Sequence, residues 1–160
     1  MPPPDPTPLA RALGRIPSGL FVVTTRVGDR RGGFLASFVQ QAAFTPPMLC
    51  LAIGRDRPVL VDVRATGRFA VAVVDGTSKG LLAAFTRRLT DGESPFDRLT
   101  VVETPGGLPV PADALAWIEC RFVGELPAGD HVLITAEAVA GALLREGDPQ
   151  VHLRRNGLSY

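Results

Sequence analysis

Hydrophobic residues along the chain come in short runs that are rich in β-branched and aromatic side chains, a pattern typical of β-strands. The runs predict strands over residues 20–25, 34–44, 48–53, 68–74, 114–126, 131–144 and 151–155, with a further short strand at 99–103. Polar, glycine-rich or proline-rich stretches separate these runs. Residues 27–33 predict a polar turn, Pro46 and Pro47 end the second strand, and residues 127–130 predict a hairpin between the two longest strands.

Three short segments show helical spacing of their apolar residues instead. They predict helices over residues 9–13, 59–65 and 80–85. Thr7 and Ser78 are placed to cap the first and the last of these helices, because a hydroxyl at this position accepts a hydrogen bond from a free backbone N–H group. Gly14 and Gly67 are placed to end the first two helices.

The long strands carry too many hydrophobic residues for a sheet that buries only one face. The sequence therefore predicts a mainly β fold, an antiparallel barrel that is closed or nearly closed, with a few peripheral helices. Closure would also protect the edges of such apolar strands from pairing with other chains. Five of the first eight residues are prolines, so we expect a disordered tail over 1–8 and one folded domain over 9–160.

Composition and charge narrow the possible function classes. Glycine (17) and proline (15) are abundant among the 160 residues, which suits a fold with many turns rather than a helical bundle. The net charge is only +1, so we expect binding to neither nucleic acid nor an anionic membrane surface. The chain starts without a basic and apolar leader, and no apolar run is long enough to span a membrane. Cys50 and Cys120 lie in apolar runs, which predicts buried thiols and a cytoplasmic location.

Several familiar catalytic motifs are absent from the sequence. It has no Gly-x-Gly-x-x-Gly after a strand and no Gly-x-Ser-x-Gly elbow. With two histidines and no Cys-x-x-Cys pair, we expect no metal site. Residues 76–80 follow a strand and open a helix, as anion sites do, but they lack the spacing of a phosphate-binding loop, so a solvated helix start is the preferred interpretation.

Two other segments carry candidate chemistry. Gln40 and Gln41 are adjacent in a predicted strand, so their side chains point to opposite faces and one of them is expected to face inward and need a partner. Arg55 and Arg57 lie just before a predicted helix start, where backbone N–H groups and guanidinium groups together suit a phosphate. Solvated loop charges are the structural alternative for the two arginines.

A set of short motifs resembles the flavin reductase family, whose members are FMN-binding split β-barrels. The motifs lie at residues 18–25, 33–47, 66–71, 114–120 and 129–131, and the resemblance covers the chain from about Leu9 to Tyr160. The branch that it resembles is the C-terminal flavin-reductase domain of flavodiiron (diflavin) proteins, through residues 35–37, the loop at 55–57 and the closing segment 152–160. The diiron and flavodoxin parts of those proteins have no counterpart here, so the resemblance implies no iron.

This resemblance implies an NAD(P)H:flavin oxidoreductase, which takes a hydride from NADH or NADPH onto FMN (with FAD left open) and hands the electrons on. It implies a flavin ring and ribityl wall made by Leu35, Ala36, Ser37, Phe38, Val39, Gln40 and Gln41. It implies that Gly54, Arg55, Asp56 and Arg57 hold the ribityl chain and phosphate, and that His131 stands near the nicotinamide as the candidate catalytic residue. The family further implies a homodimer, with a flavin-dependent monooxygenase or another electron acceptor as partner.

Some positions depart from the family pattern. Leu35 stands where the family usually has threonine, and Phe38, Gln40 and Gln41 replace hydroxyl residues. The loss of one hydroxyl hydrogen bond costs on the order of 1 kcal/mol or less, so we expect weaker but not abolished flavin binding.

Alternatives therefore stay open at two levels. Two other functions are possible alternatives to the oxidoreductase. One is a module that binds FMN or another flat ligand without NAD(P)H turnover, and the other is a carrier of small apolar ligands. Two of the candidate site residues also have a purely structural interpretation. His131 could be a surface histidine, and Ser37 could be a small residue between crowded strands. Trp117 and Cys120 are expected to fill the core.

Overall fold

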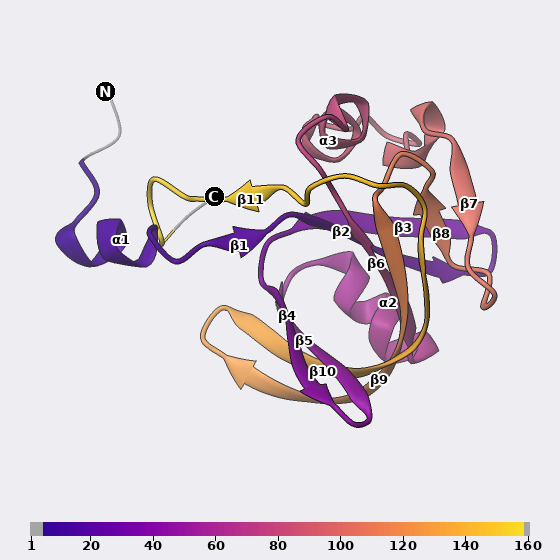
Figure 1. The fold of residues 1–160 in the computed structure, drawn as a ribbon, viewed down its shortest axis with the longest axis horizontal. Helices are drawn as coiled ribbons and strands as arrows, with labels where there is room; N and C mark the ends of the chain where they lie inside the picture. The colour runs from indigo at the N-terminus through magenta and orange to yellow at the C-terminus, as the bar shows by residue number, and fades with distance from the viewer. Residues whose placement is uncertain (1–4, 159–160) are drawn as a thin grey trace.

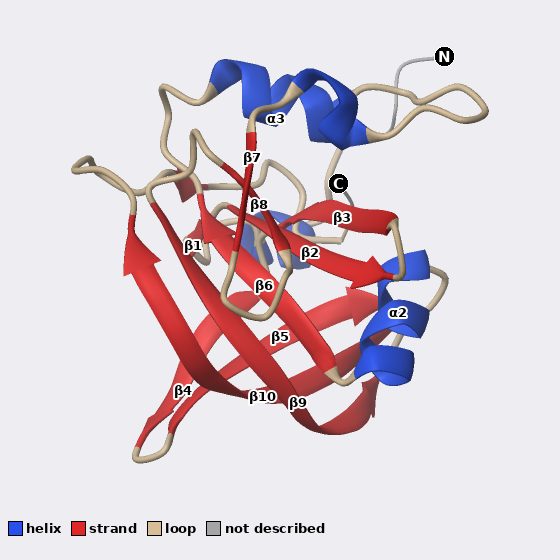
Figure 2. Cartoon of the chain, turned by 90° about the vertical axis from the view of Figure 1, so that its right-hand side faces the viewer, coloured by secondary structure: helices blue, strands red, loops and turns tan. Residues whose placement is uncertain are grey.

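The computed structural model describes residues 5–158 and has the predicted mainly β architecture (Figure 1). Seven strands form one antiparallel sheet in the order β3-β2-β6-β9-β10-β5-β4. They are β2 (Phe21–Val27), β3 (Arg30–Ala36), β4 (Val39–Phe44), β5 (Pro47–Gly54), β6 (Arg68–Val73), β9 (Ala116–Ala128) and β10 (His131–Leu143). The sheet curls into a barrel that is split between β3 and β4, which stand at the two ends of the strand order although only Ser37 and Phe38 join them (Figure 2).

Shorter elements surround this barrel. The helices are α1 (Pro8–Leu13), α2 (Pro58–Thr66), α3 (Lys79–Thr86) and the 3-10 helix η1 (Pro95–Arg98). Two small sheets pair β1 (Ser18–Gly19) with β11 (Val151–His152), and β7 (Val101–Glu103) with β8 (Pro109–Pro111). No helix within residues 5–158 combines the length and the apolar character needed to cross a membrane.

Both faces of the central strands are buried, which explains their continuous hydrophobicity. Val23 and Val71 point into the barrel interior, whereas the neighbouring Val22 and Ala72 belong to a second cluster on the outer face. Helix α2 closes one end of the barrel and adds Leu60 and other residues to the interior cluster, and α3 packs on the outer cluster (Figure 2). Trp117 and Cys120 are buried, as predicted: Trp117 lies in the outer cluster and Cys120 in the interior one.

The predicted helix ends are confirmed at three of four positions. The Thr7 hydroxyl accepts a hydrogen bond from the Ala10 N–H group (3.2 Å), Gly14 ends α1, and Gly67 ends α2 with a φ of 67°. The predicted Ser78 cap is wrong, because the Ser78 hydroxyl makes no hydrogen bond to α3 although it precedes that helix. Helix α1 begins at Pro8, within the predicted tail, and residues 1–4 of that tail lie outside the described residues.

Three predictions about strands and turns are wrong. The expected single strand over 34–44 is broken at Ser37 and Phe38 into β3 and β4. The expected turn over 27–33 is only two residues long, because Gly28 adopts a φ of 59° and allows Val27 to pair directly with Arg30. The expected strand over 151–155 ends at His152, and the short strands β1 and β8 were not predicted.

The segment after β10, residues 144–158, runs back across the barrel and brings the C-terminal end of the chain toward its N-terminal end (Figure 1). The N–H groups of Leu144 and Arg145 donate to the Leu115 carbonyl, and the Gln150 N–H group donates to the Val74 carbonyl. We call residues 144–158 the C-terminal segment. Its course matters because it ends beside the candidate site.

Candidate functional site

Two adjoining pockets lie where the β3–β4 junction meets the end of β5 and the start of β10. The larger has a volume of about 720 Å³ and the smaller about 390 Å³. Both volumes fall within the range of about 300–1,000 Å³ that is usual for small-molecule sites. Ala52, Asp130 and His131 line both pockets, so the two form one site with His131 at the junction.

The larger pocket has a mainly apolar wall. Among the predicted site residues it is lined by Ser37, Phe38, Val39 and Gln40, and it also takes in Leu51 and Leu133. The Phe38 carbonyl accepts a hydrogen bond from the Ala52 N–H group (3.0 Å), which fixes the β3–β4 junction against β5. The Ser37 side-chain oxygen is buried and has no hydrogen-bond partner among the described residues. A buried hydroxyl left in this condition indicates a place for a ligand with a polar edge.

The smaller pocket is polar at its rim. It is lined by Phe34, Leu35, Ala36, Gly54, Arg55, Asp56 and Arg57. The backbone N–H group of Arg57 donates a hydrogen bond to the Gly54 carbonyl (3.0 Å) and so closes a tight turn before α2. The Arg55 N–H group donates to the Asp130 carbonyl (3.1 Å), which fixes this turn against the β9–β10 hairpin. The backbone of both arginines is therefore fixed at one end of the site, where their exposed guanidinium groups would stabilise an anionic group.

His131 is positioned by both backbone and side-chain contacts. It is the first residue of β10 and pairs with Gly54 of β5. Its Nδ1 atom lies 2.6 Å from the Asp130 carboxylate, and its ring meets the Phe38 ring edge-on, with centroids 5.8 Å apart. The hydrogen bond from His131 lowers the pKa of Asp130, and the charge of Arg55 lowers it further. The imidazole is thus oriented by a carboxylate on one side and an aromatic ring on the other.

The structure brings eleven of the twelve predicted site residues to this pair of pockets, and Gln41 is the exception. Gln41 is exposed on β4, and its side-chain amide donates to the Ala43 carbonyl (3.3 Å). The prediction that one of the two glutamines faces inward is wrong, since Gln40 is exposed as well. The reason is that β4 is an edge strand at the split of the barrel, where Val39 packs on the interior cluster but the following residues Gln40 and Gln41 are left uncovered.

Other residues of the site were not predicted from the sequence. They include Ser18, Cys50, Arg154 and Leu158. Cys50 is half-buried, contrary to the prediction, because it stands opposite Gln40 on the exposed edge pair β4–β5. Arg154 belongs to the closing segment that carried part of the family resemblance, which was the one available signal for it.

Comparison with known proteins establishes the family. The chain matches the model of the flavin reductase like domain over residues 13–157. It belongs to the flavin reductase-like family. The predicted resemblance is thereby confirmed, and the family supports a flavin cofactor and oxidoreductase chemistry for the domain.

Diflavin flavoproteins are among the relatives of this flavin reductase-like domain. Diflavin flavoprotein A 1 of Synechocystis sp. (strain ATCC 27184 / PCC 6803 / Kazusa) is 31% identical over 154 residues, which are 95% of this chain and 27% of that protein. A protein of Nostoc sp. (strain PCC 7120 / SAG 25.82 / UTEX 2576), provisionally named diflavin flavoprotein A 5, is 35% identical over 156 residues. These residues are 96% of this chain and 27% of the Nostoc protein. The chain therefore spans about a quarter of the length of these relatives.

Solved structures share the fold. The flavin reductase PheA2 in its native state has a TM-score of 0.79 and 28% identity, with 91% of each chain covered. A homologue of nitrilotriacetate monooxygenase component B from Mycobacterium thermoresistibile has a TM-score of 0.83 over 92% of this chain and 81% of that chain. At 21% identity, this second likeness shows the split-barrel fold alone.

Proposed function

We propose that this flavin reductase-like domain binds FMN across the two pockets, takes a hydride from NADH or NADPH and passes the electrons to an acceptor. The observation that carries the proposal is the two-part site. An apolar part with an unpartnered Ser37 hydroxyl adjoins a part that is rimmed by Arg55 and Arg57. We favour FMN over FAD because both arginines lie at one end of the site, as a single terminal phosphate requires.

The residues present fit such a cofactor. A buried hydroxyl without a partner costs about 1–3 kcal/mol, and the polar edge of a flavin ring would remove that cost at Ser37. Leu51, Leu133 and Phe38 offer apolar contact to a flat ring. The turn at Gly54 fixes the backbone of the two arginines before the ligand arrives, so less backbone order has to be gained on binding.

When bound, the flavin supplies the hydride chemistry, and the protein supplies orientation and electrostatics. His131 also lines the larger pocket, which is where a nicotinamide would have to meet the proposed flavin ring. Asp130 and Phe38 restrict the imidazole to one orientation, so His131 would position the nicotinamide, and hydride transfer itself requires no protein base.

The proposal extends to a homodimer and to an electron acceptor, of which a flavin-dependent monooxygenase is one candidate. Exposed apolar side chains on the β4–β5 hairpin and β10, Phe44, Val139 and Leu143, support an interface between two copies. We propose the cytoplasm as the location, since NAD(P)H is the proposed reductant.

The test is a pair of measurements on the purified protein. Addition of the protein to FMN should quench flavin fluorescence, and NADH or NADPH should then be oxidised in air faster than in the protein-free blank. A preparation that neither quenches nor turns yellow would rule out the flavin function and leave the carrier of apolar ligands. Quenching with no oxidation above the blank would leave a flavin-binding module without turnover.

A further inference from the structure

Arg154 lies in the larger pocket in a position that the flavin site alone does not explain. Its guanidinium carbon is 4.4 Å from the centroid of the Phe38 ring, and both residues line the same pocket as His131. The Phe38 ring therefore has Arg154 over its face and His131 at its edge. The three side chains come from the C-terminal segment, the β3–β4 junction and the start of β10.

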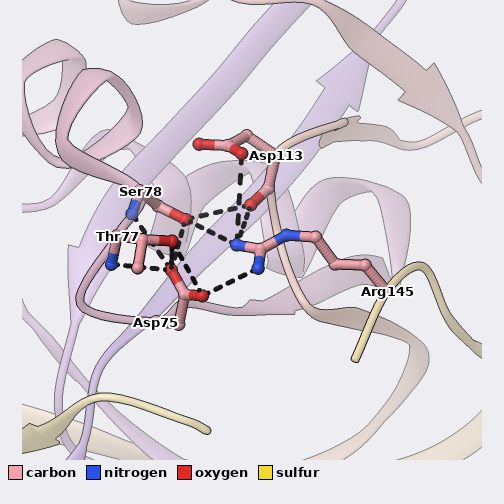
Figure 3. Close-up of polar contacts among 5 residues, drawn as sticks. All are labelled: Asp75, Thr77, Ser78, Asp113 and Arg145. Carbon is pink, nitrogen blue, oxygen red and sulfur yellow. Dashed lines mark hydrogen bonds and ion pairs between the residues drawn. The ribbon is translucent and has the colours of Figure 1, made fainter. Parts of the chain in front are cut away.

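The backbone that carries Arg154 is fixed on both sides. Upstream, the Arg145 side chain donates to the Asp75 carboxylate (2.8 Å), to the Asp113 carbonyl (3.0 Å) and to the Ser78 hydroxyl (3.1 Å), as Figure 3 shows. Immediately before Arg154, β11 pairs with β1, and after it the Gly157 N–H group donates to the Ala10 carbonyl at 2.9 Å. The guanidinium is thus delivered to the pocket by an ordered segment.

The charge of Arg154 has no acidic partner among residues 5–158. Seven other arginines of this part of the chain pair with carboxylates, namely Arg26, Arg30, Arg64, Arg68, Arg87, Arg121 and Arg145, whereas Arg154 is among those that do not. Arg154 instead rests on the Phe38 ring. A guanidinium interacts more strongly with a phosphate, through charge-assisted hydrogen bonds, than with the face of an aromatic ring. An anionic ligand in this pocket would therefore draw Arg154 toward it.

We propose that Arg154 binds the diphosphate of the pyridine dinucleotide and so selects NAD(P)H as the reductant. The inference rests on the proposed function and deepens it. Arg55 and Arg57 line the smaller pocket, which already provides for the flavin phosphate. Arg154 is the arginine of the larger pocket, which Phe38 and His131 also line, so its guanidinium is placed to bind the diphosphate of a dinucleotide whose nicotinamide lies at His131.

Equilibrium binding tests this without turnover. Calorimetric titration should show that Arg154→Ala weakens NAD⁺ roughly ten-fold or more and leaves nicotinamide riboside, which lacks phosphate, unchanged. Arg154→Lys should recover part of the loss, because lysine keeps the charge but not the two-pronged geometry. Arg155→Ala, at the exposed neighbouring residue, is the matched control and should bind NAD⁺ like the wild type.

Kinetics provides the second measurement. With saturating FMN, Arg154→Ala should raise KM for NADH by a larger factor than KM for 1-benzyl-1,4-dihydronicotinamide, which has no phosphate, with little change in kcat for NADH. Equal losses with both reductants, or weaker binding of FMN but not of riboflavin, would overturn the role of Arg154 and leave the proposed function standing. If the wild type oxidises neither reductant, the proposed function itself fails.

Discussion

The Asp75 carboxylate accepts a hydrogen bond from Arg145 at 2.8 Å, across 70 positions of sequence. The same carboxylate accepts hydrogen bonds from the N–H groups of Thr77 and Ser78, each at 3.0 Å, and from their hydroxyls (Figure 3). This cluster fastens the C-terminal segment to the loop after β6. The bond from Arg145 is the main cause of a lowered pKa at Asp75, so the cluster depends on an ionised carboxylate.

The first prediction is that this cluster makes stability depend on pH. A carboxyl whose pKa is lower in the folded than in the unfolded state adds stability above the unfolded pKa, about 3.9 for aspartate, and loses it as pH falls below that value. Asp75→Asn should therefore lower the urea midpoint at pH 7, and the gap to the wild type should narrow toward pH 3. The same change at the exposed Asp91 is the control. A gap that stays constant with pH would contradict this role of Asp75.

The Asp75 cluster also shows which features of the fold could be predicted from the sequence. The ends of α1 and α2 were predictable because Thr7 and Gly67 act on backbone groups a few residues away. Ser78 looked like a cap for the same local reason, but its hydroxyl bonds Asp75 and the carbonyl of Asp113, which is distant in sequence. Local pattern cannot indicate that a side chain has a better partner elsewhere.

The residues of the candidate site also divide into those that the local sequence indicates and those that only the fold brings together. Arg55 and Arg57 share one short turn with the start of α2, so their grouping is visible in the sequence. Cys50 and Arg154 reach the pocket only through strand pairing and through the path of the C-terminal segment. Gln41 was included because the resemblance covers a continuous stretch, whereas consecutive residues of an edge strand point in opposite directions.

The second prediction concerns the unpartnered hydroxyl of Ser37. Ser37→Ala should raise the unfolding free energy of the ligand-free protein by about 1 kcal/mol, because it removes a buried polar atom that has no partner. The same variant should bind FMN up to roughly ten-fold more weakly. Chemical denaturation and fluorescence titration measure the two effects. Ser78→Ala, which loses bonds to Asp75 and Asp113, should instead be destabilised. A Ser37→Ala protein with unchanged FMN affinity would show that this hydroxyl does not contact the flavin.

The third prediction separates the phosphate end of the site from the ring end. Replacing Arg55 and Arg57 together by alanine should weaken FMN roughly ten-fold or more, since charge-assisted hydrogen bonds to the phosphate are lost. Riboflavin has no phosphate, so its affinity should change little. Arg88→Ala, at an exposed position outside both pockets, is the control. Equal losses for FMN and riboflavin would mean that these arginines do not contact the phosphate.

The fourth prediction uses the two free thiols to locate the flavin without any turnover. Burial raises the pKa of the Cys120 thiol to about 12, and the nearby charge of Glu119 adds to the shift, so Cys120 should not react with iodoacetamide in the folded protein. Cys50 is half-buried in the wall of the larger pocket and should react. Saturating FMN should slow the labelling of Cys50 several-fold, as measured by mass spectrometry. Unfolding in urea should expose both thiols equally. If FMN binds and Cys50 still labels at the ligand-free rate, the flavin ring lies outside the larger pocket, and the assignment of Ser37 and Phe38 to its wall fails with it.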